Sequence, residues 1–314
     1  MSLVIGRNLR TVAFVGAALL MAPALRAESD RADGRFERTL KVSGPVQLSV
    51  HTGAGSIKVR SGDAATVQVV GIIKVSDNWF RSVGNAQEKV RRIEQKPPIE
   101  QAGNVIHIGR NEDRELFQNV SISYEIVTPA ETKLEANTGS GSQEITGVNG
   151  TVEAHTGSGG ITLTSIGAGG RVGTGSGSIR GTDIGGGIRA STGSGSIELV
   201  LTGAGDVELQ TGSGSIEVQG VRGALRASTG SGGIEAEGRP SSDWRAKTGS
   251  GSIRIHLPSD LAFDVDADTN SGRITVDHPV MMQGEIDKKH IRGKVRGGGL
   301  LILTHTSSGS IHIY

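Results

Sequence analysis

Glutamates recur at one position of a repeated sequence, where their spacing could gather carboxylates. Three stand six residues after a repeated threonine and a fourth lies beside the last, and these residues are Glu198, Glu217, Glu235 and Glu237. If the repeats stack as strands, the carboxylates lie close together and repel one another unless a cation bridges them. We therefore hypothesise weak calcium binding at these glutamates. The alternative is an ordinary charged face flanked by Arg180 and Arg254.

A basic stretch near the C-terminal end could bind an anionic ligand. Its candidate ligand-binding residues are Arg292, Lys294 and Arg296, which alternate with smaller or apolar residues such as Ile291 and Val295. Cations at this spacing could meet acidic polysaccharide, lipid headgroups or nucleic acid. The alternation itself favours a terminal strand whose charges simply face water. If the stretch binds an anionic glycan, neutralising the three residues together should abolish binding.

The sequence contains no recognisable motif for a catalytic or cofactor-binding site. It lacks a G-x-S-x-G nucleophile turn, an H-E-x-x-H zinc motif, a phosphate-binding G-x-x-x-x-G-K-[ST] loop and any cysteine. Histidines such as His155, His256 and His278 show no metal-ligand spacing. We therefore predict no catalytic residue, no cofactor and no enzymatic activity.

The elements that carry these candidates are set by a repeat, T-G-S-G-[SG]-I, that recurs every 18 or 19 residues. Its threonines are Thr138, Thr156, Thr174, Thr192, Thr211, Thr229 and Thr248, and outlying copies begin at Thr52, Thr269 and Thr306. Such a period is typical of a solenoid, in which each repeat is one coil that buries its apolar face only against its neighbours.

Apolar residues keep fixed places around each threonine. They stand four and two residues before it, which is the period of a strand with one buried face, and an isoleucine follows five residues after it. The isoleucines are Ile57, Ile161, Ile179, Ile197, Ile216, Ile234, Ile253, Ile274 and Ile311. Glycine supplies the corner between the two strands, and disordered low-complexity sequence would not keep this register. Gln143 and Gly170 occupy apolar positions, so we expect local loosening there.

The pattern predicts an all-β protein, a single-chain parallel β-helix (β-solenoid) with 18–19 residues per coil. We expect one domain over 28–314, with a strand and helix insertion or cap at 66–127, regular repeats at 130–275 and closing coils at 276–314. Within the insertion we expect strands at Val67–Val75, Val105–Ile108 and Val120–Val127, and a helix at Asn85–Gln95. This helix could cover an exposed sheet edge.

The first 27 residues resemble a secretory signal peptide. Arg7 and Arg10 precede an apolar run over 12–20, and cleavage is expected after Ala27. The alternative is a retained anchor. Removal of residues 1–27 takes away three arginines and no acid, which changes the formal charge from +1 to −2. A nearly neutral protein lacks the basic balance of a general nucleic-acid binder.

The order of these segments resembles a family of bacterial “putative adhesins”, an exported domain of unknown function with β-strand repeats. The resemblance rests on G-A-G-S-I-K-V at 53–59, S-I-S-Y-E-I-V-T-P at 121–129, the repeats themselves, and I-R-G-K-V-R-G-G-G-L-L-I-L at 291–303. It covers nearly the whole chain after residue 27. The resemblance implies an exported parallel β-solenoid, and it brings no catalytic or binding residues with it.

Two classes of function are compatible with the sequence. The first is an exported, non-enzymatic, adhesin-like protein, periplasmic or at the cell surface, whose sheet faces bind a glycan or protein of the cell envelope. The second is a polysaccharide lyase or hydrolase on a β-helix, which needs paired carboxylates, or a carboxylate and a base, in a groove. Enzymatic solenoids carry long loops that build such a groove, whereas the repeats from Thr138 to Thr248 hardly vary in length. The sequence therefore favours binding over catalysis.

Overall fold

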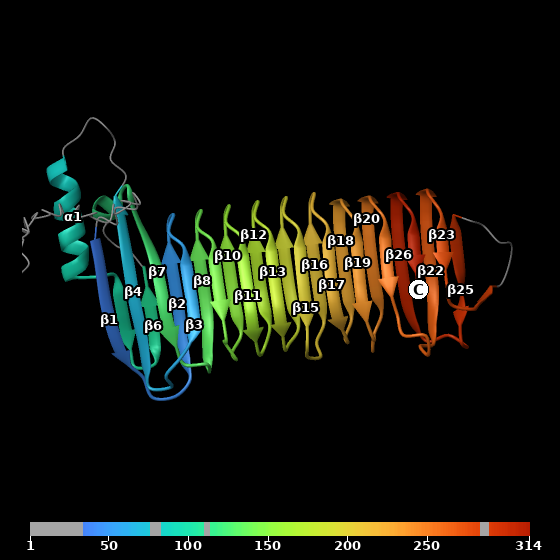
Figure 1. The fold of residues 1–314 in the computed structure, drawn as a ribbon, viewed down its shortest axis with the longest axis horizontal. Helices are drawn as coiled ribbons and strands as arrows, with labels where there is room; N and C mark the ends of the chain where they lie inside the picture. The colour runs from blue at the N-terminus through green and yellow to red at the C-terminus, as the bar shows by residue number, and fades with distance from the viewer. Residues whose placement is uncertain (1–33, 76–82, 110–113, 283–288) are drawn as a thin grey trace, which may run out of the picture. The chain divides into compact units, whose positions relative to one another are not determined.

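The computed structural model describes residues 34–75, 83–109, 114–282 and 289–314. Residues 1–27, the predicted signal peptide, lie outside this described part. Two long β-sheets extend along the described part of the chain, one in front of the other in the view of Figure 1, and enclose one hydrophobic core. We call them sheet A and sheet B.

Neighbouring strands in both sheets come mostly from successive coils. Sheet A has the order β1 (Gly34–Lys41), β4 (Thr66–Val75), β7 (Val120–Thr128), β3 (Ile57–Ser61), β9 (Gln143–Thr146), β11 (Ile161–Ile166), β13 (Ile179–Ile184), β15 (Ile197–Leu201), β17 (Ile216–Val221), β19 (Ile234–Gly238), β21 (Ile253–His256), β27 (Ile311–Ile313) and β23 (Ile274–Val276). Sheet B has the order β24 (Val280–Met282), β25 (His290–Val295), β22 (Phe263–Ser271), β26 (Leu300–Ser308), β20 (Trp244–Ser250), β18 (Leu225–Ser231), β16 (Val207–Thr211), β14 (Ile188–Thr192), β12 (Gly170–Thr174), β10 (Val152–Thr156), β8 (Thr132–Thr138), β2 (Val46–Thr52), β6 (Val105–Ile108) and β5 (Ile99–Ala102).

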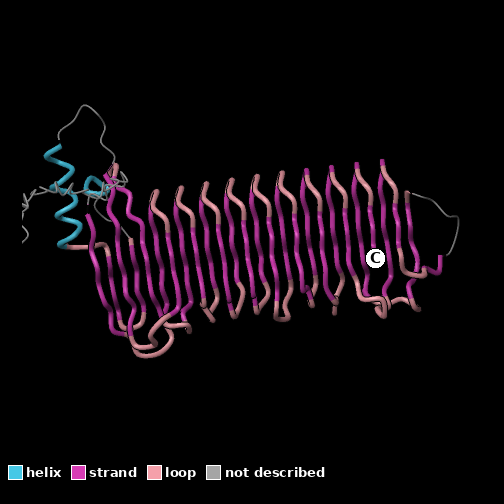
Figure 2. The backbone as a smooth tube through the Cα atoms, in the orientation of Figure 1, coloured by secondary structure: helices cyan, strands magenta, loops and turns pink. Residues whose placement is uncertain are grey.

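Each repeat forms one coil, with a strand in sheet B, a glycine corner and a strand in sheet A (Figure 2). The strands of successive coils are parallel and pair like position with like position, as Thr156 does with Thr174 and Ile161 with Ile179. The prediction of a parallel β-solenoid is therefore confirmed.

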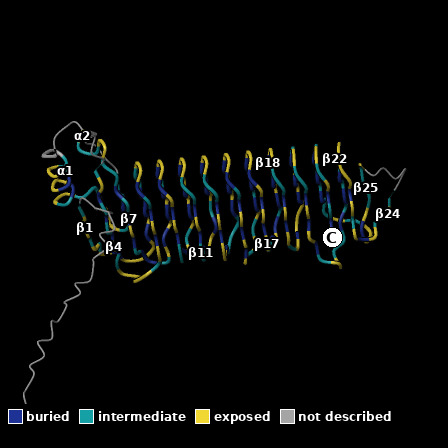
Figure 3. Tube along the Cα trace, turned by 45° about the horizontal axis from the view of Figure 1, so that its top comes forward, coloured by how far each residue is buried: buried dark blue, intermediate teal, exposed yellow. Residues whose placement is uncertain are grey.

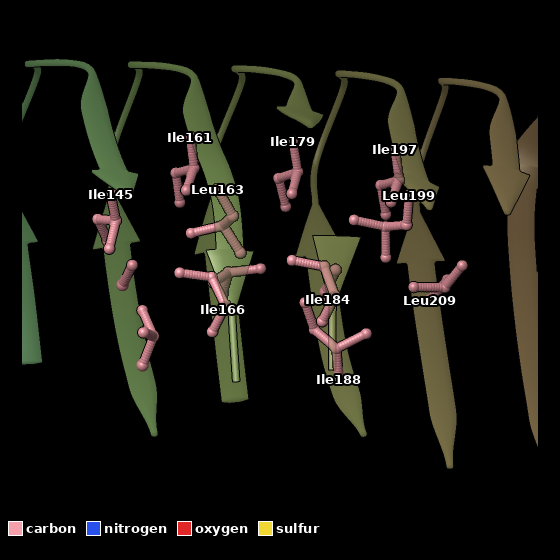
Figure 4. Close-up of a cluster of buried hydrophobic side chains, with 14 of the residues drawn as sticks. Ile145, Ile161, Leu163, Ile166, Ile179, Ile184, Ile188, Ile197, Leu199 and Leu209 are labelled. Atoms are coloured by element: carbon pink, nitrogen blue, oxygen red, sulfur yellow. The ribbon is translucent and has the colours of Figure 1, made fainter. Parts of the chain in front are cut away.

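The core is a thin double layer between the two sheets. The isoleucine that follows each corner is buried in all nine coils where the sequence places it, and four neighbouring coils show the resulting column, with Ile145 standing two residues beyond Gln143 (Figure 4). Burial alternates with exposure along the strands (Figure 3), because every second side chain points inward. Each fully buried isoleucine contributes roughly 2 kcal/mol of hydrophobic stabilisation.

The threonine of each corner joins one coil to the next. The hydroxyl of Thr192 donates to the carbonyl oxygen of Gly177 in the preceding coil, at 2.8 Å, and accepts the N–H of Gly195 in its own coil, at 3.1 Å. The same pair of bonds recurs at Thr138, Thr156, Thr174 and Thr211. A β-carbon on Gly195 would collide with the carbonyl of Gly177, so this corner position requires glycine.

The two irregular repeat positions keep their ladder register. Gln143 is buried, pairs with Ile57 and Ile161, and donates from Nε2 to the carbonyl oxygens of Ala136 and His155. Gly170 has a φ of +152°, which side chains rarely adopt. The strand register is unbroken at both places, so the ladder gives no sign of the expected loosening.

The insertion ends the stack on one side. Helix α1 (Val83–Gln95) packs against β1 and β4, with Val90 and Ile93 buried, and Glu94 accepts a hydrogen bond from the Arg35 N–H on the edge strand β1 at 2.9 Å. The predicted helix and three strands are present nearly as expected. The sequence analysis did not predict β1, β5, the short helix α2 (Arg114–Phe117) or the antiparallel pairing of β1, β4 and β7.

The other end of the stack departs from chain order. The C-terminal coil, β26 and β27, lies between the coil of β20 and β21 and the coil of β22 and β23. The threonine bonds follow the same order: Thr306 donates to Gly251, and Thr269 donates to Gly309, both at 2.9 Å. The last residues of the chain are therefore interior members of the ladder.

Candidate functional site

A row of arginines crosses the outer face of sheet B. The position three residues before the repeat threonine points away from the core, and in four coils it holds Arg171, Arg189, Arg226 and Arg245. The ladder places these residues on β12, β14, β18 and β20, with Glu208 on the intervening β16. All four guanidinium side chains are exposed. We call this set the arginine row.

Only part of this charge is neutralised within the chain. Arg189 forms an ion pair with Glu208, with N–O distances of 2.6 and 2.7 Å. Within the part of the chain that the structure describes, Arg171, Arg226 and Arg245 have neither an ion pair nor a side-chain hydrogen bond. Because the row lies on a rigid ladder, three unpaired cations are held at fixed intervals along one face.

A shallow groove follows the arginine row. It has a volume of about 640 Å³, and its edges carry Lys133, Glu153 and Asp206 beside three members of the row. Gly187 and Ala224 at the same place leave room because they lack larger side chains. The groove therefore offers both cations and hydrogen-bond acceptors to a ligand that lies across several coils.

The four glutamates proposed for calcium lie on the outer face of sheet A. Glu198, Glu217 and Glu235 occupy adjacent strands in register. Glu198 pairs with Arg180 at 3.1 Å and Glu235 with Arg254 at 3.6 Å, so arginines already neutralise both ends of the row.

The described residues contain no preformed metal-binding site. Within residues 34–75, 83–109, 114–282 and 289–314, no three His, Cys, Asp or Glu side chains are grouped so as to hold a metal ion. Calcium binding at the glutamates stays a prediction, and it would require these side chains to rearrange.

The basic stretch forms β25 and the residue directly after it, and β25 pairs antiparallel with β22, which carries Asp264 and Asp266. Arg292 lies opposite Asp266 and binds it at 2.6 Å, while Lys294 lies opposite Asp264. Arg296 donates to the carbonyl oxygen of Ser259 at 2.9 Å. Two of the three predicted ligand-binding residues are thus already engaged, and their role in glycan binding stays a prediction.

Comparison with known proteins finds a family match in the second half of the chain. Residues 171–314 match the Toastrack DUF4097 domain. The predicted resemblance to adhesin-like domains of unknown function is thereby confirmed. The Toastrack match contains the whole arginine row, the four glutamates and β25.

Three solved structures are similar to this chain over most of its length. A “putative cell adhesion protein” from Clostridium sporogenes has 11% identity over 89% of this chain and 98% of its own, with a TM-score of 0.25. A “putative adhesin” from Bacteroides fragilis has 12% identity over 89% and 97%, with a TM-score of 0.35. A “putative lipid binding protein” from Parabacteroides distasonis has 16% identity over 90% and 97%, with a TM-score of 0.36. The chain matches no curated protein sequence.

A serine, a histidine and a glutamate meet ahead of the Toastrack match. Ser49 Oγ lies 2.9 Å from His51 Nε2, and Glu135 Oε1 lies 3.9 Å from the same nitrogen. A hydrolytic triad needs the serine and the acid on opposite ring nitrogens. Because both contact Nε2 here, the group lacks the geometry of a nucleophilic site.

Two histidines of the Toastrack match flank one carboxylate. Asp268 contacts His305 at 3.0 Å and His290 at 3.4 Å, through its two oxygens. Sequence spacing did not indicate this group, since β22, β26 and β25 come together only through the interposed coil and the antiparallel pairing.

The sequence analysis also missed the arginine row, although the signal was present. The glutamates were found by following the sixth residue after each threonine, and the arginines appear when the third residue before it is followed in the same way. No periodicity could show which of those arginines are neutralised, because the pairing of Arg189 with Glu208 depends on side-chain geometry.

Proposed function

We propose that this chain is an exported, non-enzymatic, adhesin-like protein that binds a cell-envelope or surface ligand through the outer faces of its sheets. The observation that carries the proposal is the arginine row, in which three cations on a rigid sheet have no partner among the described residues. Exposed charge held at fixed intervals is suited to recognition of an extended ligand.

The proposed location outside the cytoplasm is supported by residues 1–27, with their basic start, their apolar run and the closing Ala24-Leu25-Arg26-Ala27. No described helix has both the length and the apolar character needed to cross a membrane. Periplasm and cell surface are both compatible with the proposal, and so is either a glycan or a protein of the envelope as the ligand.

A polysaccharide-cleaving enzyme is the alternative, and the acidic pair that the groove offers it is Asp206, which directly precedes β16, and Glu208 on β16. Both carboxylates line the same groove, as a pair for glycoside hydrolysis would have to. However, Glu208 is ion-paired with Arg189, and Asp206 accepts the N–H of Ala224 at 3.0 Å. Both carboxylates therefore already have partners within the chain.

Affinity capture from an envelope extract tests the proposed function. The full chain should retain a specific envelope glycan or protein, and incubation with polysaccharides should release no reducing ends or unsaturated products. Turnover that is lost in Glu208→Gln would establish the enzymatic alternative instead. Absence of any specifically retained envelope component would contradict the binding role.

A further inference from the structure

We propose that the arginine row binds an acidic linear polysaccharide of the polyuronate class, laid along the stack of coils on sheet B. This inference rests on the proposed binding function and assigns a ligand class to one face. The residues proposed to bind the ligand are Arg171, Arg226 and Arg245. Arg189 is excluded from this set because Glu208 neutralises it.

The chemistry of the three free guanidinium groups favours a carboxylate ligand. An arginine fork can donate two parallel hydrogen bonds to one carboxylate, which gives a stronger and more directional contact than a lysine does. Each of these arginines is exposed and has no ion pair or side-chain hydrogen bond with a described residue. Ligand carboxylates therefore do not have to displace an internal partner.

The spacing of the row suits a polymer with regularly placed charges. Arg226 and Arg245 lie on adjacent strands, about 4.8 Å apart, and Arg171 lies three strands before Arg226, about 14 Å away. A polyuronate carries one carboxylate on each sugar ring, so different rings of one chain can reach different arginines. The groove beside the row runs in the same direction and crosses several coils.

The acidic residues of the groove explain why a glycan is favoured over a more densely charged polymer. Glu153 and Asp206 line the groove among the cations, and Glu208 lies within the row. Sugar hydroxyls can donate hydrogen bonds to these carboxylates. A nucleic acid or an anionic membrane would instead bring phosphates close to them, where like charges repel.

The test is calorimetric titration of the full chain with polygalacturonate at low salt. Replacing Arg171, Arg226 and Arg245 together by alanine should weaken binding by about ten- to a hundredfold, as expected for the loss of three exposed charge pairs. Unfolding midpoints measured in parallel confirm that the variants remain folded.

A matched control removes the same charge from other exposed places. Arg60, Arg222 and Arg273 are exposed, have no ion pair among the described residues, and lie outside the groove. Their triple alanine variant should bind like the unmodified chain. Equal weakening by both triple variants would show a non-specific charge effect and overturn the proposal.

A variant that binds more tightly cannot be explained by misfolding, so an expected gain of affinity is tested as well. Glu208→Gln keeps the shape of the side chain but releases Arg189 and removes a negative charge from the row. It should therefore tighten polygalacturonate binding several-fold, whereas Glu235→Gln on sheet A, which also releases an arginine, should not. Unchanged or weaker binding by Glu208→Gln would contradict the assignment.

Three further experiments distinguish failure of this inference from failure of the proposed function: competition with other ligands, replacement of the basic stretch, and envelope capture with the row variant. Single-stranded DNA, phosphatidylglycerol vesicles and neutral dextran serve as competing probes, and preference for any of them over polygalacturonate overturns the ligand class. Loss of binding only when Arg292, Lys294 and Arg296 are replaced would assign the site to β25 and overturn the arginine row. If envelope capture succeeds but does not depend on the row, the inference fails while the binding function stands.

Discussion

At the scale of single residues, the corner threonine contributes to stability through two hydrogen bonds of its hydroxyl. Thr192→Val keeps the shape of the side chain but removes its hydroxyl, which leaves the carbonyl of Gly177 and the N–H of Gly195 without their partner. We expect the free energy of unfolding to fall by about 1–3 kcal/mol. Chemical denaturation measures this, and Thr162→Val on the exposed face of β11 is the matched control, expected to change little. Equal stability of the two variants would show that the corner bonds contribute nothing.

Ionisation of the buried Tyr124 phenol makes the free energy of unfolding depend on pH in the alkaline range. Burial raises the pKa of this phenol above its ordinary value, and its ring packs edge-on against Phe36 at 6.4 Å between centroids. Above a pH of about 10 the unfolded chain releases this proton while the folded chain retains it, so stability falls as the pH rises. Below that pH the group contributes no pH dependence.

Tyr124→Phe should therefore flatten the alkaline loss of stability relative to the unmodified chain. The measurement is the unfolding midpoint in urea at several alkaline pH values, with Tyr314→Phe as the control for an incompletely buried phenol. Identical alkaline slopes for the two variants would contradict the role of burial at Tyr124.

The predictability of individual residues depends on what fixes them. Burial of Ile197 and Ile216 follows from a period that the sequence displays directly. The neutralisation of Arg292 by Asp266 does not, because the two residues lie 26 positions apart and meet only through an antiparallel pairing that no repeat encodes. A charged stretch that looks free in sequence can thus be paired in the fold.

At the scale of elements, helix α1 protects the edge of sheet A. Its buried residues Val90 and Ile93 pack on β1 and β4, and Glu94 occupies the Arg35 N–H that an edge strand would otherwise present to another chain. Amphipathic spacing predicted this helix within two residues of its observed start. Its partner strand β1 was not predicted, because it lies outside the repeats.

Ile93→Glu should detach the helix, since it would bury a charge at a fully buried position. We expect the uncovered edge of β1 to pair with a second copy, so that the variant forms dimers or larger assemblies. Light scattering after size exclusion measures the mass, and Gln87→Glu on the exposed side of the helix is the control. A monomeric Ile93→Glu variant with unchanged stability would show that α1 does not protect the edge.

At the scale of the whole stack, the sequence predicts which segments are coils but not their order in space. Identical corner threonines make the coil of Thr306 and the coil of Thr269 equally good neighbours for the coil of Thr248. The choice is made by the antiparallel β24 and β25, which extend sheet B beyond β22 and leave the C-terminal coil to fill the place between. Chain order alone therefore gives the wrong neighbour at this end.

Paired cysteines test the interposed coil directly, since the chain has none of its own. Ser250 pairs with Ser308, and Ser308 pairs with Ser271, so the ladder places Ser250 and Ser271 two strands apart. Ser250→Cys with Ser308→Cys should form a disulfide under mild oxidation, because their Cα atoms are about 4.8 Å apart. Ser250→Cys with Ser271→Cys should not, because about 9.6 Å exceeds the reach of the bond. The opposite pattern, read by peptide mass after proteolysis, would restore sequential stacking and place the C-terminal coil at the end of the solenoid.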